Sequence, residues 1–268
     1  MSDVIFCLAL DNKGGVGART QARLLHASAR LNGWDGDFLV LHNKSEDFYA
    51  HRESRHARDL QVQLTPEWQG RHQSQNMKMH CDTLFDMTEY DRVMFCDIDT
   101  LFLDNPKTLF DCSDADISFA REERKITDHV FNTCFTDEQM KSFPKGTNGV
   151  NSGQFITRNR CAPKVWDRWR TVLAERWTRN NKTQDQGPFN AMLFFDGHGL
   201  KIEEFPFGYV RFPFTSKKVS AHWDAKFLHY CGWNGANKLR LGLQEFVGMC
   251  FIQKKTHEAT VLDILKCA

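Results

Sequence analysis

Short apolar runs alternate with helical patterns along the first part of the chain. Residues 4–10 and 37–42 have apolar centres, which is typical of strands buried on both faces of a sheet. Residues 20–31, between them, carry apolar side chains at helical spacing. Residues 45–59 are polar and predict a surface helix, and residues 60–64 alternate apolar and polar positions as a short strand does. This succession predicts a parallel sheet.

The remaining pattern extends this sheet. Residues 93–96 form another apolar run, and residues 74–87 before it place Met and other apolar side chains on one face of a predicted helix. Residues 116–120 and 150–157 predict two later strands. Residues 121–149 are polar and irregular, and we expect a variable insertion of loops and helices there. The predicted fold class is α/β, with a central, mostly parallel sheet flanked by helices.

The composition is that of a folded protein with almost balanced charge. Of the 268 residues, 41% are hydrophobic and 12% are aromatic, which is enough for a substantial core and argues against global disorder. Lys and Arg total 35 against 34 Asp and Glu, so the net charge is +1. Proteins that bind nucleic acid or anionic membranes usually carry a clear basic excess. We therefore expect neither partner.

The cysteines and the apolar runs bear on the compartment. Nine cysteines occur without a Cys-x-x-Cys pair, which argues against a disulfide framework or a structural zinc site. Reduced thiols are typical of cytosolic proteins. The run at residues 4–10 is too short for a signal peptide or a membrane span, and no later run is longer than a buried strand or helix requires. We expect a cytoplasmic or otherwise soluble intracellular protein without an integral membrane segment.

Two aspartates, Asp97 and Asp99, directly follow the apolar run at residues 93–96. In open α/β sheets, ligands bind outside the carboxyl ends of the strands. Carboxylates beside apolar residues need a partner there, because an unpaired buried charge is costly. Mg²⁺ or Mn²⁺ meets that need, since both prefer oxygen ligands and also bind phosphate. An isolated Asp-x-Asp is usually a solvated turn, so its position behind a strand is what favours a metal site.

The sequence from Tyr90 to Thr100, with Asp97-Ile98-Asp99 near its end, resembles the DxD region of GT-A glycosyltransferases, especially the glycogenin-like family eight. Three further stretches resemble that family's later motifs in the same order: Asn151-Ser152-Gly153, Asp185-Gln186-Gly187-Pro188-Phe189-Asn190, and His229 with Gly232 and Lys238. The joint match spans about residues 4 to 238. Gly232 and Lys238 are more widely spaced than in the family, and Lys78 lies further from the aspartates.

The resemblance implies one GT-A domain over residues 1–268, with a nucleotide-binding part over residues 1–104 and an acceptor-side part over residues 105–268. It implies a hexosyltransferase-like enzyme that moves a sugar from a nucleotide-diphosphate sugar to a glycan or other hydroxyl acceptor. UDP is the nucleotide usual in this family, and the transfer is expected to retain the anomeric configuration. The cofactor implied is Mn²⁺ or Mg²⁺.

The resemblance also implies a role for each motif residue. The metal ligands are Asp97, Asp99 and His229. The residues at the reacting sugar are Asp185, Gln186 and Asn151. The residues that bind the nucleotide sugar are Leu10, Asp11, Asn12, Lys78, Ile98, Gly232 and Lys238.

Simpler alternatives remain open at several of these positions. Asp185 also suits a helix N-cap, where its carboxylate would accept backbone N–H bonds. Lys78 could be an ordinary solvated lysine, and His222 is a second candidate for the third metal ligand. Among functions, a nucleotidyltransferase or sugar-nucleotide pyrophosphorylase would need a glycine-rich first loop with basic residues, which Gly14-Gly15 with Lys13 only partly supplies. A non-catalytic carbohydrate-binding protein is the other alternative.

Overall fold

A computed structural model describes residues 2–10, 16–43, 57–62, 77–180, 185–196, 199–213, 225–231 and 235–253. The strands are β1 (Ser2–Ala9), β2 (Asp37–His42), β3 (Ala57–Gln61), β4 (Tyr90–Cys96), β5 (Thr100–Phe102), β6 (Ile117–Lys125), β7 (Asn148–Arg158), β8 (Ile202–Glu204), β9 (Val210–Arg211) and β10 (Phe227–His229). The helices are α1 (Val16–Leu31), α3 (Lys107–Phe110), α4 (His129–Asn132), α5 (Asp137–Ser142), α6 (Ala162–Asn180), α7 (Gln186–Ala191) and α8 (Gly235–Gln253).

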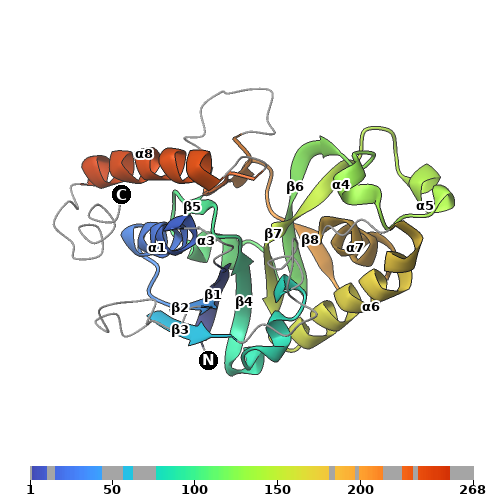
Figure 1. The fold of residues 1–268 in the computed structure, drawn as a ribbon, viewed down its shortest axis with the longest axis horizontal. Coiled ribbons are helices and arrows are strands. Elements are labelled where there is room, and N and C mark those ends of the chain that lie inside the picture. Colours follow the sequence, from blue (N-terminus) through green and yellow to red (C-terminus); the bar gives the residue numbers. More distant parts are fainter. Residues whose placement is uncertain are drawn as a thin grey trace. The chain divides into compact units, whose positions relative to one another are not determined.

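The fold is α/β, as the sequence predicts (Figure 1). A seven-stranded sheet has the order β3-β2-β1-β4-β7-β6-β8, and a three-stranded sheet has the order β5-β10-β9. The pairs β1–β2, β2–β3 and β6–β8 are parallel, whereas β6 and β7 are antiparallel. The prediction of a central, mostly parallel sheet with helices is therefore confirmed.

The chain forms two compact units whose segments interleave along the sequence. Unit 1 comprises Met1–Asp3, Gln63–Phe95 and Ser113–Phe205. Unit 2 comprises Val4–Val62, Cys96–Cys112 and Pro206–Ala268. The single domain with a division at residue 104 stays a prediction.

Unit 2 is built on the apolar run of β1. Val4 to Cys7 are completely buried, and β2 pairs beside them in register, Val4 with Asp37 and Ala9 with His42. Helix α1 packs against α8 and β5 (Figure 1). Leu24 on α1, Leu101 on β5, Leu228 on β10 and Phe246 on α8 share one core cluster. Burying these side chains fixes β5 and β10 as neighbours, because each contributes to the same apolar contact.

Unit 1 is organised around β7, α6 and α7. The rings of Phe155 on β7, Trp166 and Trp169 on α6, and Phe189 on α7 contact one another at centroid distances of 4.8 to 5.9 Å. All four are completely buried. Such aromatic groups bury large areas and pair edge-to-face or tilted, so this cluster holds both helices against the strand.

The predicted helix over residues 74–87 is wrong for its second half. Only Met77 and Lys78 are helical in its described part, and two 3-10 helices follow, Cys81–Thr83 and Met87–Glu89. The backbone carbonyls of Lys78 and Met79, which a continuing helix would use, accept hydrogen bonds from side chains of α6 instead. Tertiary contacts here override the helical periodicity.

Three other boundaries also differ from the sequence prediction. β3 begins at Ala57 within the predicted polar helix, because it pairs with β2 from that residue onward. Helix α1 begins at Val16 rather than at residue 20. The predicted insertion at residues 121–149 is partly regular: β6 continues to Lys125, and α4 and α5 follow.

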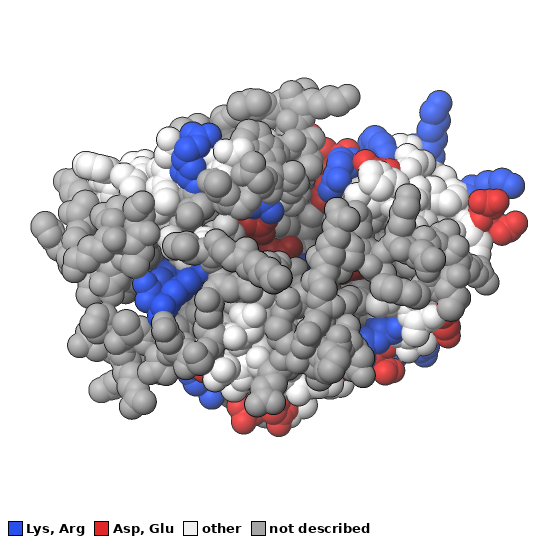
Figure 2. Space-filling view, in the orientation of Figure 1, with Lys and Arg blue, Asp and Glu red and all other residues white. Residues whose placement is uncertain are grey.

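Charged side chains of both signs lie on the described surface. Figure 2 shows basic and acidic side chains interspersed on the described part of this face. In the part of the chain that the structure describes, no helix combines the length and the hydropathy needed to cross a bilayer.

Candidate functional site

The first candidate cluster, in unit 2, forms at the turn that follows β4. The buried run Val93 to Cys96 ends there, and Asp97, Ile98 and Asp99 form the turn into β5. The Thr100 hydroxyl donates to the carbonyl of Asp97 at 2.5 Å, and the Tyr230 amide donates to the carbonyl of Asp99 at 2.8 Å. These bonds hold the backbone of the turn at both aspartates.

His229 reaches this turn through sheet pairing. β10 runs antiparallel to β5, and His229 lies opposite Thr100 in the register. Its Nε2 atom lies 3.3 Å from Oδ1 of Asp99 and 3.7 Å from Oδ2 of Asp97. One ligand atom from each of Asp97, Asp99 and His229 lies within 4.8 Å of the others. The structure thus brings together the three predicted metal ligands.

Lys238 on α8 adds a fourth charged group to the cluster. Its ammonium group contacts the second carboxylate oxygen of Asp99. Burial alone would raise the pKa of Asp99, but His229 and Lys238 outweigh it and hold that pKa far below its usual range. Burial would likewise lower the pKa of Lys238, and the attraction of Asp99 raises it instead. Both groups are therefore charged at neutral pH.

This donor set fits a divalent cation. Two carboxylates and one imidazole suit Mn²⁺, and carboxylates with water or phosphate oxygens suit Mg²⁺. The competing ligand His222 lies outside the described residues.

The residues predicted to bind the nucleotide are described only in part. Leu10 is buried at the end of β1, and Ile98 is partly exposed between the two aspartates. Asp11, Asn12 and Gly232 lie outside the described residues.

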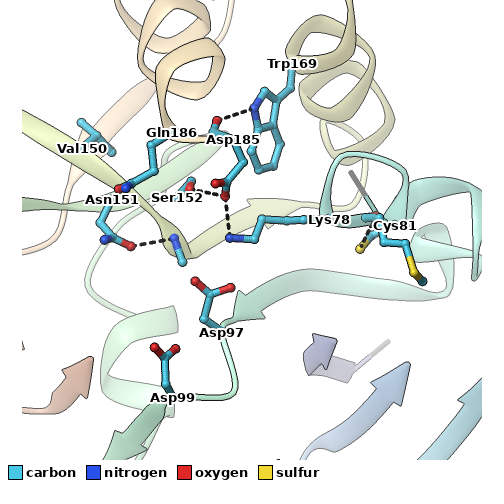
Figure 3. A network of polar contacts seen from close by, with 12 residues as sticks. Lys78, Cys81, Asp97, Asp99, Val150, Asn151, Ser152, Trp169, Asp185 and Gln186 are labelled. Atoms are coloured by element: carbon cyan, nitrogen blue, oxygen red, sulfur yellow. Dashed lines mark hydrogen bonds and ion pairs between the residues drawn. The ribbon is translucent and has the colours of Figure 1, made fainter. Parts of the chain in front are cut away.

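The second candidate cluster lies in unit 1 and centres on a buried ion pair (Figure 3). Nζ of Lys78 lies 2.7 Å from Oδ2 of Asp185, and each residue is only 6% exposed. The Ser152 hydroxyl donates to the same carboxylate oxygen at 2.7 Å. Burial would raise the pKa of Asp185, but Lys78 and Ser152 together lower it. Asp185 is therefore an anion at neutral pH.

The structure rejects both simpler alternatives at this pair. Asp185 precedes α7, but its backbone is already helical and its side chain makes no capping hydrogen bond. Lys78 is buried rather than solvated. The indole N–H of Trp169 donates to the carbonyl of Asp185 at 3.0 Å, and that of Trp166 donates to the carbonyl of Lys78 at 2.9 Å. Helix α6 therefore anchors both partners through their backbone.

Asn151 and Gln186 complete the second cluster. Oδ1 of Asn151 accepts from the Gly153 amide at 2.7 Å, and its Nδ2 donates to the carboxylate of Glu122. The Oε1 atom of Gln186 is buried and has no hydrogen-bond partner among the described residues. A buried acceptor without a donor costs about 1–3 kcal/mol. The Gln186 amide is therefore suited to a hydroxyl group of a bound ligand.

Asn190 holds the Asp-Gln segment against β7. Its Oδ1 accepts from the Val150 amide, and its Nδ2 donates to the carbonyls of Val150 and Gln186, each at 2.8 Å.

Sequence reasoning missed Glu122, Trp166 and Trp169 as supporting residues. Glu122 lies within a run of charged residues, and a buried tryptophan resembles any other core residue, so neither carried a signal.

A family model described as nucleotide-diphospho-sugar transferase matches residues 43–240. A search of curated proteins returned no match. Among solved structures, galactosyltransferase LgtC in complex with donor and acceptor sugar analogs is 16% identical, with a TM-score of 0.59. The match covers 92% of this chain and 99% of that one.

Two further solved structures have the same fold. An active-site glutamine-to-glutamate mutant of LgtC is 16% identical with a TM-score of 0.61, and the match covers 92% of this chain and 95% of that one. The apo structure of the bifunctional glycosyltransferase WbbM is 14% identical with a TM-score of 0.61. That match covers 99% of this chain and 52% of WbbM, so the chain spans about half of WbbM.

Proposed function

The chain belongs to the nucleotide-diphospho-sugar transferase family, and we propose that it is a metal-dependent transferase for a UDP-sugar. The sugar would pass to a hydroxyl group of a glycan or similar acceptor, with retention of the anomeric configuration. The observation that carries this proposal is the Asp97–Asp99–His229 group, whose ligand atoms lie within 4.8 Å of one another. His229 is far from the two aspartates in sequence, and imidazole with carboxylate ligands suits Mn²⁺.

At the donor diphosphate, Asp97, Asp99 and His229 would hold Mn²⁺ or Mg²⁺. A bound divalent cation supplies Lewis-acid stabilisation of the negative charge on the departing nucleotide. Lys238 carries a second positive charge in this cluster and would add to that stabilisation as a point charge on phosphate. Leu10, Asp11, Asn12, Ile98 and Gly232 keep their predicted role in nucleotide binding.

At the sugar, Asp185 would stabilise the positive charge that develops on the anomeric carbon, because Lys78 and Ser152 keep it ionised. The amide of Gln186 has a buried oxygen that a sugar hydroxyl would satisfy. Asn151 would contact the sugar from the start of β7.

A thermal-shift panel tests the proposal. Nucleotide sugars that differ in base and sugar are added with Mn²⁺, with Mg²⁺ or with a chelator. A donor at 100 times its Kd should stabilise the fold by about 2.7 kcal/mol, and only when metal is present. Asp99→Asn should abolish this shift, whereas Asp111→Asn removes an equal charge from an exposed site and should keep it.

Product analysis separates the remaining functions. Turnover with a suitable acceptor should release free nucleoside diphosphate. Release of pyrophosphate would instead identify a nucleotidyltransferase, and binding without turnover of any donor would identify a carbohydrate-binding protein. The cytoplasmic location predicted from the composition stays a prediction.

A further inference from the structure

Glu122 on β6 is a buried acidic residue to which the proposed reaction assigns no role. Its side chain is completely inaccessible to solvent. One carboxylate oxygen lies 2.6 Å from Nε of Arg124, and the other accepts a hydrogen bond from Nδ2 of Asn151. A carboxylate is rarely buried so completely unless a specific arrangement of partners compensates it.

The strand pairing around this residue is irregular. The register between β6 and β7 shifts between Phe119 and Arg121 and again between Arg121 and Lys125. Such bulges re-aim side chains and are common next to active sites. The adjacent Glu123 is exposed, as expected for a charged run, whereas Glu122 faces the interior.

The two partners of the Asn151 amide determine its orientation. The carboxylate of Glu122 only accepts hydrogen bonds, so the NH₂ group of Asn151 must face it. The backbone N–H of Gly153 only donates, so Oδ1 must face Gly153. With these two bonds the amide keeps one further N–H and one further lone pair, which is the donor–acceptor pair that a sugar hydroxyl can use.

Arg124 supplies a positive charge beside the carboxylate of Glu122. Its guanidinium group bonds Glu122 and also lies 5.1 Å from the centroid of the Phe131 ring. A charged acceptor makes a stronger hydrogen bond than a neutral one. The series Phe131, Arg124, Glu122 and Asn151 therefore runs continuously from α4 to the start of β7.

We propose that Glu122 is a positioning residue for sugar transfer: it fixes the Asn151 amide in the one orientation that meets the donor sugar. This inference rests on the proposed function, in which Asn151 contacts that sugar. Glu122 itself touches no substrate and acts only through Asn151.

The test compares Glu122→Gln with Glu123→Gln, which makes the same change on the neighbouring exposed position. Glutamine keeps the size of the side chain, but it cannot present oxygens to both Asn151 and Arg124. We expect kcat to fall about ten-fold, as for the loss of one charged hydrogen bond in the transition state, while the donor KM changes less than about two-fold. Glu123→Gln should leave both constants unchanged.

A double-mutant cycle with Asn151→Ala distinguishes positioning from simple stabilisation. If Glu122 acts through Asn151, then Glu122→Gln should not lower kcat further in the Asn151→Ala background. The proposal would be overturned if the fold-losses of kcat from the two single variants multiplied in the double variant. An unchanged kcat in Glu122→Gln would overturn it as well. Should Glu122→Gln fail to fold, Glu122→Asp keeps the charge but withdraws it from Asn151, and the same loss of kcat is expected.

A second readout does not depend on turnover. The side-chain amide protons of Asn151, assigned by their absence in Asn151→Ala, should exchange with solvent more slowly in the unmodified chain than in Glu122→Gln. Equal exchange rates would overturn the proposal even in an active enzyme. Slow exchange in a chain that turns over no donor would instead contradict the proposed function and leave the orientation of Asn151 established.

Discussion

Replacing Lys78 by methionine should destabilise the protein strongly, because it leaves the carboxylate of Asp185 buried without its counter-charge. Both side chains are only 7% exposed. Breaking a buried pair by removing one partner costs about 3–5 kcal/mol. Methionine retains most of the apolar stem of lysine, so packing changes little, although the ammonium contact 5.0 Å from the Phe95 ring is lost. Urea denaturation at pH 7 measures the change in free energy of unfolding.

The double variant tests the origin of this cost. Asp185→Asn alone should also destabilise, because it leaves the ammonium group of Lys78 buried. Lys78→Met combined with Asp185→Asn removes both charges, and its loss should be smaller than the sum of the single losses by about 2–3 kcal/mol. If Asp185 only capped the helix, Asp185→Asn would cost little stability, because asparagine caps nearly as well as aspartate.

The pH dependence supplies a second signature. Burial raises the pKa of Asp185, but Lys78 and Ser152 lower it below its ordinary value of 3.8. The pair therefore stabilises the fold fully above that value, and this contribution is lost as the pH falls towards the lowered pKa. In Lys78→Met, the effect of burial on Asp185 dominates, and the pKa of its carboxyl group rises. The stability difference between the unmodified chain and Lys78→Met should therefore shrink as the pH is lowered from 7 to 4.

Two results would refute this reasoning. One is a loss below about 1 kcal/mol for Lys78→Met at pH 7, which is the size expected of an exposed ion pair. The other is a stability difference that does not change between pH 7 and pH 4.

Further predictions concern the metal group and the support of α7. Asp97→Asn or Asp99→Asn should leave the fold intact and abolish Mn²⁺-dependent donor binding in thermal shift; wild-type turnover in a chelating buffer would contradict this. His229→Ala should raise the Kd for Mn²⁺, measured by titration, by about ten-fold or more, whereas His222→Ala should change it little. Asn190→Ala removes three hydrogen bonds, two of them buried, and should lower the free energy of unfolding by about 2–4 kcal/mol. An unchanged melting temperature would show that these bonds do not anchor α7.

The sequence alone determined the fold class and the candidate metal carboxylates. Buried strands leave a continuous apolar run, and β1, β2 and β4 were all recognisable from theirs. Asp97 and Asp99 follow such a run directly, so their place at the end of a strand is a local property of the chain.

The partners of the candidate site residues were decided by tertiary structure. Lys78 and Asp185 are separated by 107 positions, and only the packing of α6 against their backbone carbonyls brings them together. A capping rule describes hydrogen bonds within a few residues of a helix start, so it assigned Asp185 a local role that the buried lysine replaces.

The same limit explains Glu122 and the segment at residues 74–87. Glu122 looks like its exposed neighbour in sequence, and only the folded sheet shows that it is buried against Asn151. Residues 74–87 have helical periodicity, yet Trp166 and Arg170 bind the carbonyls that a helix would need. The spacing of apolar residues reports which positions along one helix or strand are buried. Which distant residue contacts each of them depends on how the elements pack together, and no local pattern encodes that.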